Sequence, residues 1–424
     1  MKKQYYIFAG AFFFSLGGNI LNFSLIYRLA DWFSFSPGKI GAFIALGQIF
    51  YFLGCNLYHR FGSLINPVRV FTVSASVIFI ASFPLGHFRM QNLAYVSYWT
   101  LQLSTGLFWP PVMAWITEGL SEKELTREIS LFNRSWMSAN MAGPLIAGAL
   151  YNWNSRVNFL IINLSYFLVI LLFYRMRRRL PESGMKETGL PHSAPASALP
   201  AVTSLALPAA AAPAGPDEGE LPVPPESRLH SPAVKALDRK LDLYRFRGWM
   251  GGFSSSLFVG VLVNIVPLHI RDGLGYTAKS AGMLLFIRCT MGFLMFGLLA
   301  RFTAWHFNRR WFIFLQAGLV LCSFLFMIAG SRLFMYFTVA VVYGFVNAAC
   351  YNTSLFYSGA TGMNPKKNMA LHEIFLCMGN AIGTAGGGFF YQHINFSGTC
   401  FVLLLVLGMG IGILVMLEKR ERKA

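Results

Sequence analysis

Long apolar runs alternate along the chain with short polar segments. Each run has roughly 20 residues, which as a helix is long enough to cross a hydrocarbon core of ~30 Å. The pattern predicts six spans before the middle of the chain and six after it, at residues 5–29, 38–58, 67–87, 93–117, 128–151, 157–175, 244–270, 277–300, 311–329, 333–358, 368–391 and 397–417. We therefore expect an all-α membrane protein with twelve transmembrane helices.

The two sets of spans repeat the same small and polar residues. The repeat is clearest between the fifth and eleventh spans, where four residues return after about 240 positions: Asn140, Gly143, Gly148 and Tyr151 correspond to Asn380, Gly383, Gly388 and Tyr391. Gly18 and Asn22 of the first span correspond in the same way to Gly260 and Asn264 of the seventh. This duplication predicts two pseudo-symmetric six-helix bundles with a pathway between them.

A segment rich in Pro, Ala and Ser separates the two sets of spans. Such a composition cannot bury a core, and it is typical of a solvated linker that lets two bodies move relative to each other. The sequence therefore predicts three parts, which are an N-terminal six-helix bundle at 1–179, a cytoplasmic disordered linker at 180–240 and a C-terminal six-helix bundle at 241–424.

Composition supports a membrane protein, because 55% hydrophobic and only 12% charged residues leave no surface for a water-soluble globule. The net charge of +18 does not indicate a nucleic-acid partner, since the basic residues concentrate on alternate loops. By the positive-inside rule these loops are cytoplasmic. We expect a multi-pass protein of the cell membrane with both termini in the cytoplasm.

The sequence shows no arrangement typical of an enzyme. The six cysteines lie in or beside predicted spans without paired spacing, and no metal-ligand spacing, nucleotide-binding loop or nucleophile elbow is present. We predict a protein without a catalytic site, metal or cofactor, and without ATP as its energy source.

Twelve spans with an internal repeat and a long central linker resemble the major facilitator superfamily of secondary transporters over nearly the whole chain. The most specific local similarity is Gly143-Pro144-Leu145-Ile146-Ala147-Gly148, which is similar to the Gly-Pro-x-x-Gly-Gly element of that family. The loop after the second span keeps only Arg60 and Gly62 of the family's Gly-x-x-x-Asp-Arg-x-Gly-Arg-Arg element. The resemblance implies alternating access, with an altered latch at this loop.

Small residues recur at every fourth position on the fifth and eleventh spans. Such stripes let helices approach closely where lipid offers no hydrophobic driving force. We expect roles in helix packing and gating for the glycines of these stripes and for the loop residues, namely Gly143, Pro144, Gly148, Gly379, Gly383, Gly387, Arg60 and Gly62.

Arg288 lies near the middle of the eighth span, too deep for its side chain to reach either surface. A charged side chain at that depth costs about 2.5–3.5 kcal/mol on insertion scales unless it faces a cavity or a partner. Two interpretations stay open, because Arg288 can receive an anionic group of a substrate or can pair with an acid inside the bundle.

Other polar and aromatic residues complete the predicted substrate-binding set. Gln48 lies close to the position that is equivalent to Arg288 in the first half, and Asn19 and Asn22 share a face of the first span. Two prolines after Trp109 predict a kinked or broken fourth span, and the indole can stack on a ring. The predicted set is Arg288, Gln48, Asn19, Asn22, Asn264, Trp109, Asn140, Asn380 and Arg134.

Glu373 and His372 are the candidates for coupling, because both carry groups that can exchange a proton near one end of the eleventh span. The alternatives are that both are hydrated at the membrane surface, or that one of them pairs with a neighbouring basic loop. The coupling ion is accordingly H⁺ or Na⁺.

These observations favour a monomeric secondary transporter of a small organic solute, with an anion as the first candidate because of Arg288. Import and export stay open. The alternatives are a receptor or sensor that has kept a transporter fold without transport, and a proton-driven exporter of lipophilic compounds.

Overall fold

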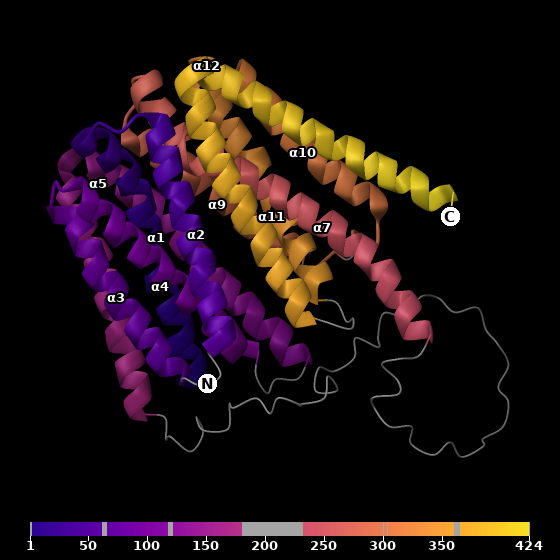
Figure 1. Ribbon diagram of the computed structural model, residues 1–424, viewed down its shortest axis with the longest axis horizontal. Coiled ribbons are helices and arrows are strands. Elements are labelled where there is room, and N and C mark those ends of the chain that lie inside the picture. Colours follow the sequence, from indigo (N-terminus) through magenta and orange to yellow (C-terminus); the bar gives the residue numbers. More distant parts are fainter. Residues whose placement is uncertain are drawn as a thin grey trace.

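The computed structural model describes residues 2–61, 66–117, 122–179, 232–299, 301–302, 304–359 and 365–423. These residues form helices joined by short connections, and no strand occurs among them (Figure 1). The prediction of an all-α membrane protein with twelve transmembrane helices is confirmed. Most of the predicted linker lies outside the described residues.

The first half contains five helical elements. The fifth is two transmembrane helices that meet at Asn154, where φ of −160° and ψ of 107° interrupt the helix. The elements are α1 (Lys2–Phe33), α2 (Pro37–Phe61), α3 (Pro67–His87), α4 (Gln91–Thr117) and α5 (Glu122–Arg179).

The second half repeats this order. Its last element bends at Ile394 and Asn395 and so contributes the last two transmembrane helices. The elements are α7 (Pro232–Asn264), α8 (Val266–Leu268), the π-helix η5 (His269–Gly273), α9 (Ala278–Leu299), α10 (Arg309–Ile328), α11 (Leu333–Gly359) and α12 (Pro365–Lys423).

Nine helical stretches of the described residues are long and apolar enough to cross a membrane. The longest, Leu371–Arg420, contains both crossings of α12. The remaining two helices, α4 and the first part of α5, carry more polar side chains, which is typical of helices that do not face lipid on all sides.

The asparagines that start and separate helices repeat in the two halves. Asn66 accepts a hydrogen bond from the backbone of Val68 at the start of α3, and Asn308 accepts one from Arg310 at the start of α10. Asn154 and Asn395 cap the helices that follow the two bends in the same way. Asparagine side chains replace the missing helical acceptors at these positions, so the repeat extends to the local capping chemistry.

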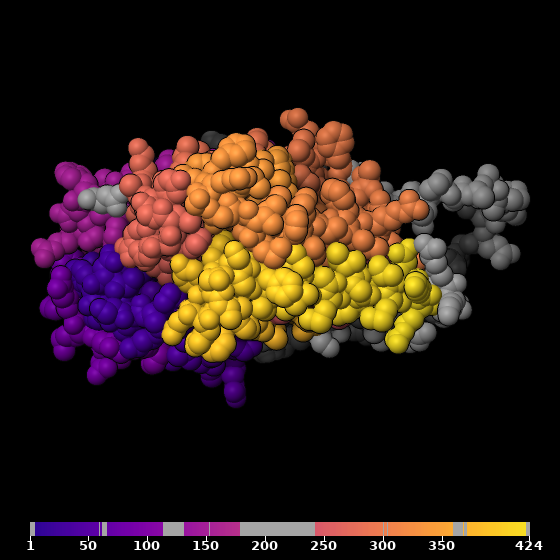
Figure 2. All heavy atoms as spheres, turned by 90° about the horizontal axis from the view of Figure 1, so that it is seen from above, coloured from indigo at the N-terminus to yellow at the C-terminus, as the bar shows by residue number. Residues whose placement is uncertain are grey.

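The bundle has two faces. We call the face at which α1 begins and α5 ends the linker face, and the face at which α1 ends and α2 begins the hairpin face. The helices of the second half slant away from the first half toward the linker face (Figure 1). Figure 2 looks onto the hairpin face, where atoms of the two halves meet.

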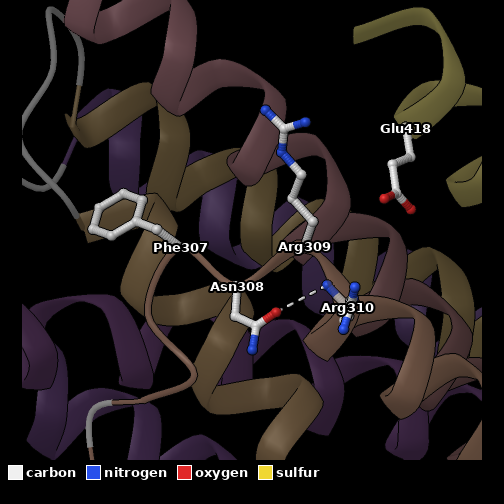
Figure 3. A pocket seen from close by; sticks show the side chains of 5 residues that line it. All are labelled: Phe307, Asn308, Arg309, Arg310 and Glu418. Carbon is white, nitrogen blue, oxygen red and sulfur yellow. Dashed lines mark hydrogen bonds between the residues drawn. The ribbon is translucent and has the colours of Figure 1, made fainter. Parts of the chain in front are cut away.

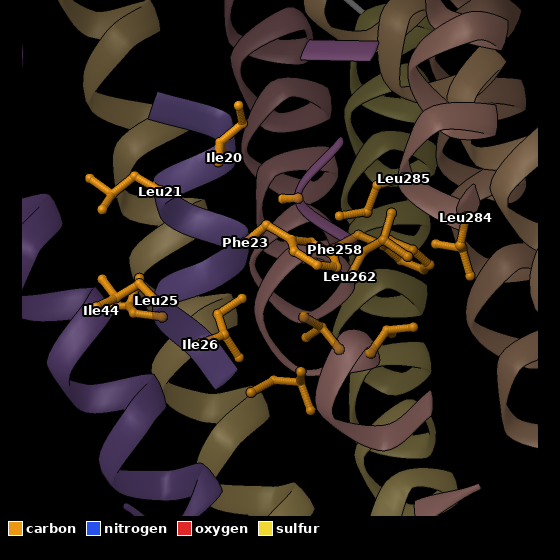
Figure 4. Close-up of a cluster of buried hydrophobic side chains, with 14 of the residues drawn as sticks. Ile20, Leu21, Phe23, Leu25, Ile26, Ile44, Phe258, Leu262, Leu284 and Leu285 are labelled. Atoms are coloured by element: carbon orange, nitrogen blue, oxygen red, sulfur yellow. The ribbon is translucent and has the colours of Figure 1, made fainter. Parts of the chain in front are cut away.

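Buried apolar side chains join the two halves. Phe23 of α1 points toward Phe258 and Leu262 of α7, beside Leu284 and Leu285 of α9 (Figure 4). All five are at most 2% exposed. Close contacts between such side chains stabilise the junction mainly by dispersion, because lipid is as apolar as the protein interior.

One of two alternatives for the fourth span is excluded, and one local feature was not predicted. Of the kink or break expected at Pro110 and Pro111, the break is absent, because α4 continues to Thr117. Neighbouring helices can support a transmembrane helix at a proline, so the two missing backbone donors do not end it. The π-helix η5 was not predicted, because the apolar run of the seventh span continues smoothly through Val266 and Leu268.

Candidate functional site

Arg288 lies on α9 and is half-buried. Its guanidinium carbon is 5.8 Å from the ring centre of Tyr343 on α11, close to the outer limit of a cation–π contact. Its buried Nε has no hydrogen-bond partner, and no described acid forms an ion pair with it. The internal acid considered as a partner is therefore not found in the described part of the chain.

Hydrogen bonds hold the surroundings of Arg288. The Tyr343 hydroxyl donates to the backbone oxygen of Ser255 at 2.8 Å. The Ser255 hydroxyl in turn donates to Asn347 Oδ1, also at 2.8 Å. These residues were missed in the sequence, although Tyr343 and Asn347 are one helical turn apart on α11. Three helices, α7, α9 and α11, thus meet beside a cation that has no counterion among the described side chains.

Gln48 lies on the face of α2 that packs against α12. Gly41, two turns before it, contacts Thr384, and Cys55, two turns after it, interacts electrostatically with Glu373. Residues seven positions apart lie on one helix face, so Gln48 faces α12 between these contacts. Its side chain is half-buried and has no hydrogen-bond partner in the described ranges.

Several predicted amides bond helices together within one half. Asn19 donates to Asn140 at 2.6 Å, which joins α1 to α5. Asn264 donates to Thr384 at 2.9 Å, which joins α7 to α12. Thr384 donates further to Asn380 at 3.4 Å. These side chains satisfy each other, as buried amides in a membrane must.

The other predicted binding residues lie in different surroundings. Asn22 and Arg134 are exposed. Trp109 is half-buried and packs edge-on against Phe14 and Phe132, with ring centres 5.3 and 6.1 Å away. Trp109 therefore belongs to an aromatic cluster of the first half.

Glu373 and His372 are neighbours in sequence but point in different directions. His372 is buried, and its Nδ1 lies 2.7 Å from the hydroxyl of Ser354 on α11. The Glu373 side chain is exposed and interacts electrostatically with Tyr51 and Cys55 of α2. Glu373 thus lies between the two halves, whereas His372 lies inside the second half.

Three glycines of the eleventh span, Gly379, Gly383 and Gly387, pack within their own half. A methyl group on Gly379 would lie 3.0 Å from the Ser256 side chain, and one on Gly387 would lie 2.9 Å from Val261, both on α7. Gly383 contacts the backbone of the same helix. In the first half, Gly143 packs in the equivalent way against Asn19 of α1.

Two other glycines, Gly148 and Gly388, pack across the two halves. A Cβ on Gly148 would lie 2.6 Å from the carbonyl oxygen of Ala278 and 3.2 Å from Gly282 Cα, both on α9. A Cβ on Gly388 would likewise lie 3.2 Å from the Cα atom of Gly41 on α2. The two halves therefore touch through a repeated pair of glycine crossings on the hairpin side.

An ion pair joins the two halves at the hairpin face. Arg271 of η5 donates to Asp31 of α1, with both Nη atoms 2.9 Å from carboxylate oxygens. Tyr151 donates to the same carboxylate at 2.7 Å. Tyr27 of α1 donates to the backbone oxygen of Pro267 at 3.1 Å. We call Asp31, Arg271, Tyr151 and Tyr27 the hairpin lock.

A separate pocket of about 440 Å³ lies at the linker face, lined by Phe307, Asn308, Arg309, Arg310 and Glu418 (Figure 3). It contains none of the residues around Arg288.

No group of three or more His, Cys, Asp or Glu side chains suited to a metal occurs among the described residues. Arg60 is exposed beside Phe61, and Gly62 lies outside the described residues.

We compared the chain with models of known protein families and with known proteins. The model of the Major Facilitator Superfamily matches residues 7–368. No curated protein matches the sequence.

Solved structures of transporters have the same fold at low sequence identity. A peptide transporter POT in complex with sulfate has a TM-score of 0.72 at 12% identity, over 99% of this chain and 94% of that one. A POT family transporter in complex with 5-aminolevulinic acid has a TM-score of 0.73 at 10% identity, over 99% of this chain and 96% of that one. At such identities the similarity shows the fold alone.

Proposed function

Because this chain belongs to the Major Facilitator Superfamily, we propose that it is a secondary transporter that moves a small organic anion by alternating access between its two halves. The observation that carries the proposal is the Arg288 guanidinium, half-buried in the bundle and without a described acid partner. An anionic group of a substrate supplies the missing counterion.

The residues around Arg288 suit such a ligand. Asn347 of α11 is half-buried, and its Oδ1 accepts hydrogen bonds from the buried hydroxyls of Ser255 and Tyr343, which fix the orientation of the amide. A held polar surface loses little conformational entropy on binding. Carboxylate and phosphate groups match the fork of donors on an arginine.

The relation of the two halves supports an inward-facing state. The hairpin lock and the glycine crossings join the halves on one side, while the helices slant apart toward the linker face (Figure 1). The positive-inside rule makes the linker face cytoplasmic, with both termini there. In this orientation the site around Arg288 opens toward the cytoplasm, and the hairpin lock is the closed outer gate.

Glu373 is the proposed coupling group. It lies where α12 faces α2, so its surroundings change when the two halves move. Protonation of a carboxylate at such a junction can be linked to the equilibrium between the two states. His372 is instead bonded to Ser354 within one half and serves as a packing residue.

Thermal unfolding of the purified, lipid-reconstituted protein with a panel of metabolites tests the proposal. The panel includes sulfate and 5-aminolevulinic acid, because transporters of the same fold have been solved in complex with these compounds. A ligand that binds the folded state stabilises it by about 2.7 kcal/mol at a hundred times its Kd. We expect organic anions to raise the melting temperature of the parent and of Arg332→Ala, but not of Arg288→Ala.

Arg332 is the matched control because it is an exposed arginine of the same half. If neutral or lipophilic compounds stabilise the parent and Arg288→Ala equally, the organic-anion proposal is wrong, and an exporter of lipophilic compounds replaces it.

A further inference from the structure

Three arginines gather at the hairpin end of the first half. The guanidinium carbon of Arg28 lies 3.0 Å from the ring centre of Trp32, and that of Arg89 lies 4.8 Å from the same ring. Arg156, which follows the bend in α5, interacts electrostatically with Arg28. We call Arg28, Arg89 and Arg156 the arginine cluster.

Arg28 is buried and incompletely bonded. It is 1% exposed, its Nη2 donates to the backbone oxygen of Gly86, and the ring of Phe159 covers it at 4.5 Å. Its Nε and Nη1 have no partner in the part of the chain that the structure describes. A buried cation without a counterion is costly, and two further cations nearby increase that cost.

The described acids of the hairpin face do not balance the cluster. These acids are Asp31 and Asp272, and both are bonded to Arg271 of the other half. The arginine cluster therefore carries an excess positive charge, although Tyr151 of the hairpin lock lies close enough to interact electrostatically with Arg28.

The outer part of the cluster is accessible and borders an apolar surface. Arg89 and Arg156 are exposed. Large apolar side chains of the same end are exposed too, since Phe83 is 48%, Trp153 78% and Leu160 59% exposed. The helix α3, which carries Phe83, lies on the outer side of the first half, away from the second half (Figure 1).

We propose that the arginine cluster binds a phosphate group, and that the apolar surface beside it favours an anionic phospholipid as its source. Arg89 and Arg156 contact the phosphate, and the positive charge of Arg28 beneath them increases its attraction. The acyl chains lie along the exposed apolar side chains of α3 and α5. Aromatic side chains such as Trp153 are common at this depth of a bilayer.

The test measures phospholipid binding to the detergent-purified full chain by native mass spectrometry. Phosphatidylglycerol and phosphatidylcholine are titrated into the parent and into the double variant Arg89→Gln/Arg156→Gln. The control is Lys279→Gln/Arg332→Gln, which removes two exposed cations from the hairpin face of the other half. A parallel arm adds inorganic phosphate without lipid and follows the melting temperature.

We expect the parent and the control to bind phosphatidylglycerol at least tenfold more tightly than phosphatidylcholine, and the Arg89→Gln/Arg156→Gln variant to lose most of this preference. If inorganic phosphate alone raises the melting temperature of the parent as much as the anionic lipid does, the phosphate site stands and its ligand is free phosphate. Equal binding of phosphatidylglycerol by the parent and the double variant overturns the proposal.

Discussion

Arg271 and Asp31 are 240 positions apart in the sequence and form a two-pronged ion pair, with both Nη atoms 2.9 Å from carboxylate oxygens. The pair joins η5 of the second half to α1 of the first. Arg271 is 20% exposed and Asp31 41%, so water screens the pair only in part. An interaction between two rigid bodies that forms on one side of the membrane biases them toward the state closed on that side.

Asp31→Asn is expected to shift the protein toward the outward-facing state. The variant loses the charge of the pair, worth on the order of 1 kcal/mol for a partly exposed contact, which is roughly a fivefold change in the equilibrium between the two states. The rate at which an impermeant thiol reagent, added at the hairpin face, modifies a cysteine in place of Asn22 measures this change. We expect the rate to rise several-fold.

Asp272→Asn is the matched control, because Asp272 bonds Arg271 from the same half and does not join the two halves. If both variants change the labelling rate equally, the contact with Asp31 has no special role in holding the hairpin face closed.

Arg288→Lys is expected to weaken substrate binding without abolishing it. Lysine keeps the charge but lacks the planar fork of donors, whereas Arg288→Gln loses the charge as well. A charge-assisted hydrogen bond contributes about 1.5–3 kcal/mol, so we expect kcat/KM of uptake to fall at least tenfold in the Lys variant and further in the Gln variant. Equal losses in both variants would contradict a role for the charge.

Glu373→Gln is expected to remove the response of uptake to a pH gradient and to leave substrate exchange intact. Glutamine keeps the shape of the side chain and cannot release a proton. The measurement compares gradient-driven uptake with equilibrium exchange in proteoliposomes. Glu418→Gln serves as control, because that acid lies in the linker-face pocket. Retained proton-driven uptake in Glu373→Gln would assign the coupling elsewhere.

Gly148→Ala is expected to destabilise the contact between α5 and α9. The added methyl group would lie 2.6 Å from the Ala278 carbonyl oxygen, so the helices must separate, at a cost of about 1–3 kcal/mol. Gly297→Ala on α9 is the control, since no atom lies within 4 Å of the added group. We expect the melting temperature to fall in Gly148→Ala and to stay unchanged in Gly297→Ala. An unchanged value would mean that the crossing is not closely packed in solution.

The sequence predicted the helices and their repeat because both depend on local patterns. The twelve spans follow from the length of the apolar runs. The glycines of the eleventh span lie on one helix, α12, and pack closely against neighbouring helices, as their spacing predicted. Arg288 was found for a physical reason, because a charge in the middle of an apolar span stands out against its neighbours.

Contacts between distant helices could not be predicted in the same way. Asp31 and Arg271 lie at the ends of two spans, where charges are common, and nothing in the pattern shows that these ends meet. The opposite orientations of His372 and Glu373 depend on which neighbour each helix face meets. The continuity of α4 through Pro110 likewise depends on its packing within the bundle and not on its own sequence.

Cross-linking of the hairpin face tests alternating access most directly. The variant Asp31→Cys/Arg271→Cys is reconstituted, and a short bis-methanethiosulfonate reagent joins the two introduced thiols across the two halves. Uptake of a compound found in the thermal screen is measured before cross-linking, after it and after reduction, with the parent and its six native cysteines as control. We expect cross-linking to stop uptake and reduction to restore it. Uptake that continues at the same rate in the cross-linked protein would contradict alternating access through this face.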